Sequence, residues 1–86
     1  MSYPVRISPS ARRDLESRLP QAVAAAALVF IHGPLLENPH RVGKPLKRDL
    51  EGLWAARRGQ YRVVYEVIED GLVSVVRVAH RADVYY

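Results

Sequence analysis

The sequence predicts an α+β domain in which a helical first half covers a sheet formed by the second half. Residues 8–33 carry proline-marked helix starts and apolar residues at helical spacing, whereas from Leu53 onward the apolar residues recur with a period of two. Two turn signals, Gly59-Gln60 and Asp70-Gly71, divide this second half into three β segments. We expect one domain, residues 1–86: an N-terminal strand, then a two-helix hairpin packed on one face of a small antiparallel sheet that ends in a three-stranded meander.

The first half begins with residues 3–7, YPVRI, which predict a short edge strand because proline is tolerated at a strand start. Ser8 followed by Pro9 is a helix-start signal, and Asp14 suits the positive end of that helix's dipole. The first helix is expected to reach about Leu19, and Pro20 starts a second helix that Gly33 and Pro34 close. The second helix has an apolar stripe of Val23, Ala26, Ala27 and Phe30.

The strands should each have one core face and one open face, because successive side chains point to opposite sides of a sheet. The middle strand has Tyr61, Val63, Tyr65 and Val67 on one face, which turns Arg62 outward. In the strand before it, Trp54 and Ala56 read as core, and Leu53, Ala55 and Arg57 face outward. In the last strand the alternation predicts a core face formed by Leu72, Val76 and Val78. The outward face of that strand then holds Val73, Val75, Arg77, Ala79 and Arg81.

The open face therefore collects Arg57, Arg62, Arg77 and Arg81. One interpretation is that these arginines pair with Glu66 or Asp83 on a solvated sheet. The other is a phosphate site, since the planar guanidinium binds phosphate oxygens through two parallel hydrogen bonds.

Composition narrows the classes of function. Thirteen Lys and Arg against nine Asp and Glu give a net charge of +4, and seven of the thirteen lie between Arg41 and Arg62, which suits a polyanionic partner or a solvated loop. The chain has no cysteine, so neither disulfides nor thiolate metal sites are available. A signal peptide and a full-length apolar span are missing from the sequence, which favours a cytoplasmic protein without membrane contact.

Two segments carry a family resemblance. "GLWAARRGQYRVVYEV" followed by "VVRVAHRADVY" resembles the RelE family of toxin-antitoxin toxins, in which a G-x-Y-R strand precedes a closing H-R-x-x-V-Y pattern. The resemblance extends over nearly the whole chain and includes the order of strand, two helices and meander. It implies the toxin of a type II system that acts as a ribosome-dependent endoribonuclease, cutting messenger RNA in the A site and so inhibiting translation and growth.

The family reaction is attack of a ribose 2'-hydroxyl on the adjacent phosphate, which implies neither metal nor cofactor. By resemblance, Arg62 and Arg81 hold the scissile phosphate, and Tyr85 orients the nucleotide or takes part in proton transfer. His80 is a candidate acid or base because histidine changes charge near neutral pH, although its core register also fits a structural histidine.

The sequence departs from the family at Leu53 and Ala55, where well-studied members place basic residues, and this leaves the general base open. Compensation, or binding to ribosomal RNA, is expected from the nearby basic residues Lys44, Lys47, Arg48, Arg57 and Arg58.

The resemblance also implies partners and alternatives. An acidic RelB-like antitoxin should wrap the toxin, and operator DNA should be contacted only through that antitoxin. A ParE-like toxin that binds DNA gyrase without cutting RNA, or a catalytically inactive homologue, is the alternative function.

Overall fold

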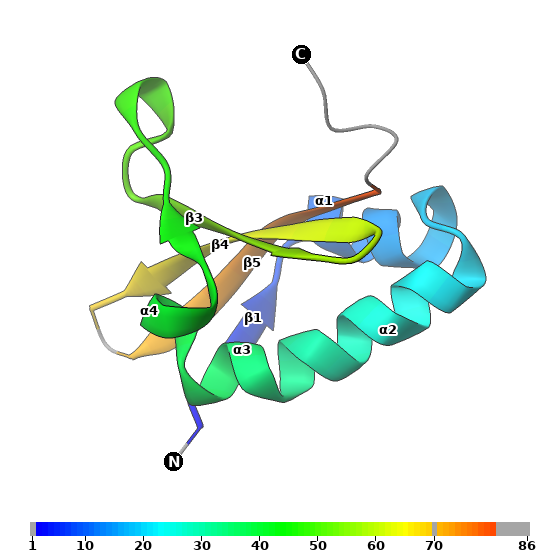
Figure 1. Ribbon diagram of the computed structural model, residues 1–86, viewed down its shortest axis with the longest axis horizontal. Coiled ribbons are helices and arrows are strands. Elements are labelled where there is room, and N and C mark those ends of the chain that lie inside the picture. Colours follow the sequence, from blue (N-terminus) through cyan, green and yellow to red (C-terminus); the bar gives the residue numbers. More distant parts are fainter. Residues whose placement is uncertain (1, 70, 81–86) are drawn as a thin grey trace.

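The computed structural model describes residues 2–69 and 71–80, which form five strands and six short or medium helices. Figure 1 shows the sheet crossing the middle of the molecule with α2 running along one side of it. The elements in chain order are β1 Val5–Ile7, α1 Pro9–Arg13, the π-helix η1 Asp14–Arg18, α2 Gln21–His32, α3 Pro34–Glu37, α4 Pro39–Val42, β2 Lys44–Pro45, the 3₁₀-helix η2 Arg48–Leu50, β3 Leu53–Arg58, β4 Tyr61–Ile68 and β5 Leu72–His80.

The helix boundaries follow the proline and capping signals. Ser8 is the N-cap of α1 with an extended backbone, and its side-chain oxygen accepts the Ala11 N–H at 3.1 Å. α1 continues directly into η1, so the first helical segment ends at Arg18, and α2 ends at His32 before Gly33. The two predicted helices are confirmed, whereas α3 and α4 were not expected.

The sheet has the order β1-β5-β4-β3-β2. β3, β4 and β5 pair antiparallel as predicted, and β2 pairs antiparallel with β3. β1 lies parallel to β5, so the sheet is mixed and not purely antiparallel. The parallel pairing arises because the chain crosses over through α1 to β4 before β5 returns beside β1. β2 adds a fifth strand from a segment that the sequence presents as a basic loop.

The core lies between α2 and one face of the sheet. Tyr61, Val63 and Tyr65 of β4 are buried as predicted, together with Ala56 of β3. The predicted stripe of α2 is wrong at one position, because Ala26 is exposed while Ala24 and Ile31 are buried. The stripe is wider than the predicted spacing because α2 packs against both the sheet and α3.

β5 contradicts the predicted core register. Val73 and Val75 are fully buried, whereas Leu72 and Val76 are only half-buried. The reason is a β-bulge: Tyr65 pairs with Val75, but Val64 pairs with Arg77, so Val76 is the extra residue. The bulge reverses the alternation, and Val78 returns to the core as predicted.

Tyr65 fixes the segment before β2. Its hydroxyl donates a hydrogen bond to the Pro39 carbonyl, and burial raises the pKa of Tyr65 to about 12, against a lowering effect of the Arg58 charge. A Cβ at Gly43 would collide with this hydroxyl and lie 2.8 Å from the Ala55 carbonyl oxygen. Glycine at position 43 therefore lets the chain between α4 and β2 lie close to Ala55 of β3 and Tyr65 of β4.

Among residues 2–69 and 71–80, no helix combines the length and apolar character needed to cross a membrane.

Candidate functional site

The open face of the sheet lies opposite α2, and the segment containing η2 rises beside it (Figure 1). Arg57 of β3 and Arg62 of β4 face each other directly across the two strands. Ala79 pairs with Arg62 from the other side, and Val64 pairs with Arg77. Of the four predicted arginines, Arg57 and Arg62 thus form a cross-strand pair. Arg77 lies on the same face, opposite Val64, which is two residues after Arg62.

Arg62 lies where two hollows meet, and it lines both of them. The hollow of about 460 Å³ lies toward β2 and is lined by Arg41, Val42, Gly43, Lys44, Leu46, Ala55, Arg57, Arg58 and Arg62. The hollow of about 550 Å³ lies toward β5 and includes apolar side chains from η2, β3 and β4, among them Leu50, Leu53 and Val64. Arg62 therefore lies between a basic hollow and a largely apolar one.

The charges of Arg57 and Arg62 are not compensated by carboxylates in the part of the chain that the structure describes. Like charges directly opposite each other in a sheet are destabilising. The repulsion between Arg57 and Arg62 is relieved when an anion binds between them, and a phosphate group has the shape and charge to bind two guanidinium groups.

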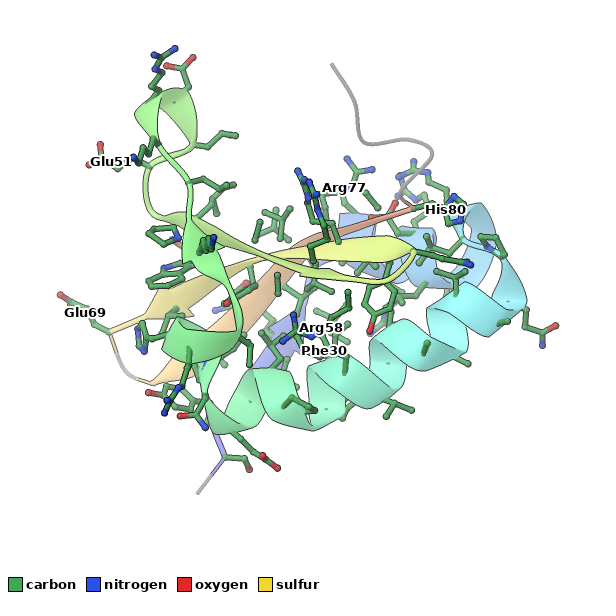
Figure 2. The ribbon with its side chains drawn as sticks, viewed as in Figure 1. Phe30, Glu51, Arg58, Glu69, Arg77 and His80 are labelled. Atoms are coloured by element: carbon green, nitrogen blue, oxygen red, sulfur yellow. The ribbon has the colours of Figure 1, made fainter. Side chains whose placement is uncertain are left out.

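Arg77 is held differently, because it forms an ion pair with Asp14 of η1. Its Nε donates to Asp14 Oδ2 at 2.8 Å and its Nη2 to Oδ1 at 3.3 Å. Asp14 was not among the partners named in the sequence interpretation, and of those two Asp83 lies outside the described residues. Figure 2 shows Arg77 on the side of the sheet away from α2.

Asp14 is the residue whose role the sequence did not reveal. Its side chain is 1% exposed and accepts four hydrogen bonds, including those from Arg18 Nη1 at 3.0 Å and the Val78 N–H at 2.9 Å. Burial alone raises the pKa of Asp14, but the bonds from Arg77, Val78 and Arg18 outweigh burial and hold the pKa below its ordinary value. The spacing of three residues between Asp14 and the buried Ala11 is the sequence signal for this burial, whereas the sequence analysis assigns Asp14 to the helix dipole alone.

Arg58 points to the other side of the sheet from Arg57. Its guanidinium carbon lies 4.9 Å from the centre of the Phe30 ring of α2, a cation–π contact that Figure 2 shows below the sheet. Its Nη1 also donates to the Arg57 carbonyl at 2.9 Å. Arg58 therefore packs against the helix layer, and it also lines the basic hollow.

His80 ends β5 and pairs with Tyr61, which places it in the register of the helix-covered face, but it also lines the hollow of about 550 Å³ together with Arg62. It is half-buried, and Figure 2 shows it at the far end of the strand from the β4–β5 turn. Arg81 and Tyr85 lie outside the described residues.

The other basic residues divide into two groups. Lys44 lines the basic hollow together with Arg57 and Arg62. Lys47 and Arg48 are exposed at the start of η2 and line neither hollow. Arg48 has a φ of 62°, a left-handed conformation that is uncommon for a residue other than glycine.

Metal binding has no candidate in residues 2–69 and 71–80, because no three His, Asp or Glu side chains gather there.

Comparison with known proteins places this geometry in a family. A model described as the ParE toxin of the type II toxin-antitoxin system parDE matches residues 5–85. Toxin RelE of Mycobacterium tuberculosis is 55% identical over 85 residues, covering 96% of this chain and 86% of that toxin. The chain is a RelE-family toxin of a type II toxin-antitoxin system. Toxin RelG of the same organism is 48% identical to it over 86 residues, covering 99% of this chain and 98% of RelG.

Solved structures agree with the fold of this RelE-family toxin. The toxin-antitoxin complex RelBE2 of M. tuberculosis matches with a TM-score of 0.89 and 45% identity, covering 94% of this chain and 100% of that one. The archaeal RelE-RelB complex of Pyrococcus horikoshii matches with a TM-score of 0.62 and 27% identity, covering 98% and 100%.

Proposed function

We propose that this toxin is a ribosome-dependent endoribonuclease that cuts messenger RNA in the A site. The observation that carries the proposal is the Arg57–Arg62 pair at the junction of two hollows on the open face, which has no carboxylate partner among the described residues. The relatives named RelE and RelG support it by their similarity along the whole chain.

The proposed reaction is attack of a ribose 2'-oxygen on the adjacent 3' phosphorus, with cleavage of the bond from phosphorus to the 5'-oxygen. The 2'-hydroxyl loses its proton and the departing 5'-oxygen gains one, so the products are a 2',3'-cyclic phosphate and a 5'-hydroxyl. Arg62 and Arg81 bind the phosphate and stabilise the charge that accumulates on its oxygens. Tyr85 orients the nucleotide or transfers a proton near the 2'-oxygen.

His80 is the second candidate for proton transfer. Its register on the side of Tyr61 favours a structural role, so Tyr85 is the stronger assignment. Replacing each in turn separates them: we expect His80→Gln to retain most of the cleavage rate and Tyr85→Phe to lose most of it.

RNA binding is assigned to the basic residues around the open face. Lys44 and Arg57 share the hollow with Arg62 and would bind the messenger backbone there. Lys47, Arg48 and the Arg58 end of the β3–β4 hairpin are exposed and would contact ribosomal RNA, where backbone charge supplies most of the affinity.

A RelB-like antitoxin is the proposed protein partner in the cytoplasm. The similar structures of RelBE2 and of the archaeal RelE-RelB pair are complexes with an antitoxin. Operator DNA would be contacted through that antitoxin.

A gyrase-binding toxin is the second candidate. The matching family model carries the ParE description, and Leu53 and Ala55 make the open face less basic than a nuclease of this family would be. Induction of the DNA-damage response with intact messenger RNA would favour this candidate.

The test is to map messenger RNA ends after brief expression of the toxin and three variants. We expect the wild type to cut within translated codons, and Arg62→Ala and Arg81→Ala to lower cleavage by about 100-fold, the usual loss when a transition-state charge donor is removed. Arg13→Ala, on the exposed surface of α1, is the matched control and should cut like the wild type. Full cleavage by both Arg62→Ala and Arg81→Ala, with folding verified by circular dichroism, would refute the proposed site.

A further inference from the structure

We propose that Ser8 and Asp14 form a clamp that holds the β-bulge of β5 and so sets which face of the sheet Arg77 occupies. Asp14 is then a positioning residue for the arginine site, and this catalytic part of the inference rests on the proposed function.

The bulge determines the phase of β5. Val73 and Val75 before it are buried under the helices, and Val78 after it is also buried, an odd number of residues later. Without the extra residue Val76, strict alternation would turn Arg77 into the core and Val78 outward. The bulge is therefore the reason that Arg77 and Ala79 share the open face with Arg62.

The clamp acts where β1 ends. β1 pairs with β5 only as far as Ile7 opposite Val75, so the edge of β5 beyond that point has no neighbouring strand. Ser8 continues the edge contact: its N–H donates to the Val75 carbonyl at 3.0 Å and its hydroxyl donates to the Val76 carbonyl at 2.8 Å. The hydroxyl reaches the bulged residue itself.

Asp14 holds the other end of the bulge. One carboxylate accepts both the backbone N–H of Val78 and the guanidinium of Arg77, at 2.9 and 2.8 Å. Together Ser8 and Asp14 contact four consecutive residues of β5, from Val75 to Val78. A bulge beside a site commonly re-aims a side chain, and here both its flanks are bound from one helical segment.

The burial of Asp14 supports a dedicated role. A buried carboxylate is costly unless it is paired and hydrogen-bonded, and Asp14 is 1% exposed. It lies at the start of the π-helix η1, a form that is rare and often found at functional sites.

The experiment compares purified full-length toxins carrying Asp14→Asn, Ser8→Asp and Arg18→Gln. Ser8→Asp keeps a helix N-cap but has no hydroxyl to donate to Val76. Arg18→Gln is the matched control, because it removes the exposed cation that pairs with Asp14 and leaves Ser8, Asp14 and their bonds to β5 in place. Ser8→Thr keeps both the cap and the donor and should behave as the wild type.

Two readouts are used. Hydrogen exchange and cross-strand nuclear Overhauser contacts, measured by NMR, report whether Val78 stays protected and whether Val64 stays opposite Arg77. Single-turnover cleavage on programmed ribosomes reports the rate at saturation and the half-saturating toxin concentration separately.

We expect Asp14→Asn and Ser8→Asp to lose protection at Val78 and the Val64–Arg77 contact. Their cleavage rate should fall by about 10- to 100-fold, as for a misplaced catalytic group, with the half-saturating concentration changed less than about twofold. Arg18→Gln and Ser8→Thr should remain within about twofold of the wild type in both readouts.

Three results would overturn the clamp: folded Asp14→Asn that retains both the contacts and the rate, equal losses in Arg18→Gln, or loss of overall stability in the variants with an unchanged β5 register. A wild type that cuts no RNA would refute the proposed function instead, and the NMR readouts would still decide the clamp. If Asp14→Asn does not fold, the comparison of Ser8→Asp with Ser8→Thr in the same two readouts decides whether the clamp exists.

Discussion

The two faces of the sheet are built from the same strands, yet one face is buried in the core and the other presents charged side chains. On the helix-covered face of β4, Tyr61, Val63 and Tyr65 are buried against α2. On the open face the residue between the first two of these, Arg62, faces Arg57 and is free of carboxylate partners among the described residues. Stability thus comes from one face and charge is presented on the other, so substitutions one position apart should have separable effects.

The largest separation is expected at Tyr65 and Val64, adjacent residues on opposite faces. Tyr65→Ala should lower the free energy of unfolding by about 3–5 kcal/mol, the usual cost of truncating a fully buried aromatic side chain. It also removes the hydrogen bond to the Pro39 carbonyl that ties down the segment before β2. Val64→Ala, half-buried in the open face, should cost about 1 kcal/mol or less.

Urea unfolding followed by circular dichroism measures both variants. In a domain of this size the loss at Tyr65 is enough to unfold a large share of the molecules. Equal losses at Tyr65 and Val64 would mean that the open face contributes to the core, contrary to the comparison.

A smaller effect, which depends on pH, is expected where the two faces meet at Asp14. Because its pKa is lower in the folded state than in the unfolded chain, Asp14 contributes stability above the unfolded pKa, near 4. This contribution is lost as the pH falls through the lower, folded pKa. Hydrogen bonds to a charged group suggest a contribution of about 1–3 kcal/mol at neutral pH.

The measurement is the difference in unfolding free energy between the wild type and Asp14→Asn from pH 7 to pH 2.5. We expect the wild type to be more stable at neutral pH and the difference to shrink below about pH 4. Other carboxylates titrate in both proteins and cancel. A difference that stays constant down to pH 2.5 would show that the charge of Asp14 is not what stabilises the contact.

The same contrast explains what the sequence could predict. In β4 one register is apolar throughout and the other holds Arg62 and Glu66, and the predicted faces of Arg62 and Tyr65 are those of the structure. β5 reads LVSVVRVAH, with apolar residues in both registers around the bulge, so its first half was assigned to the wrong faces. Local spacing cannot reveal a bulge that is held by residues more than 60 positions away.

The site shows the same limit. The arginine pair follows from strand alternation alone, but the partner of Arg77 lies in η1 and depends on tertiary packing. The short elements α3, α4 and β2 have two to four residues each, too few to show a period. The predicted roles of Arg81 and Tyr85 remain predictions, because these residues lie outside the described part of the chain.

The smallest effect should appear at Arg57 and Arg58, neighbours in β3 whose side chains lie on opposite faces. Arg58→Ala removes the cation–π contact with Phe30 and should destabilise the toxin by about 0.5–1 kcal/mol. Arg57→Ala relieves the repulsion of Arg62 directly across the strand pair and should be neutral or slightly stabilising.

Inorganic phosphate sharpens this last contrast. An anion bound between Arg57 and Arg62 stabilises the folded state by an amount that grows with the logarithm of its concentration, so phosphate should raise the melting temperature of the wild type and of Arg58→Ala. Arg57→Ala should lose most of that increase, and sodium chloride at matched ionic strength controls for screening. A phosphate response that survives in Arg57→Ala and disappears in Arg58→Ala would place the anion on the helix-covered side of the hairpin and reverse the assignment of the two faces.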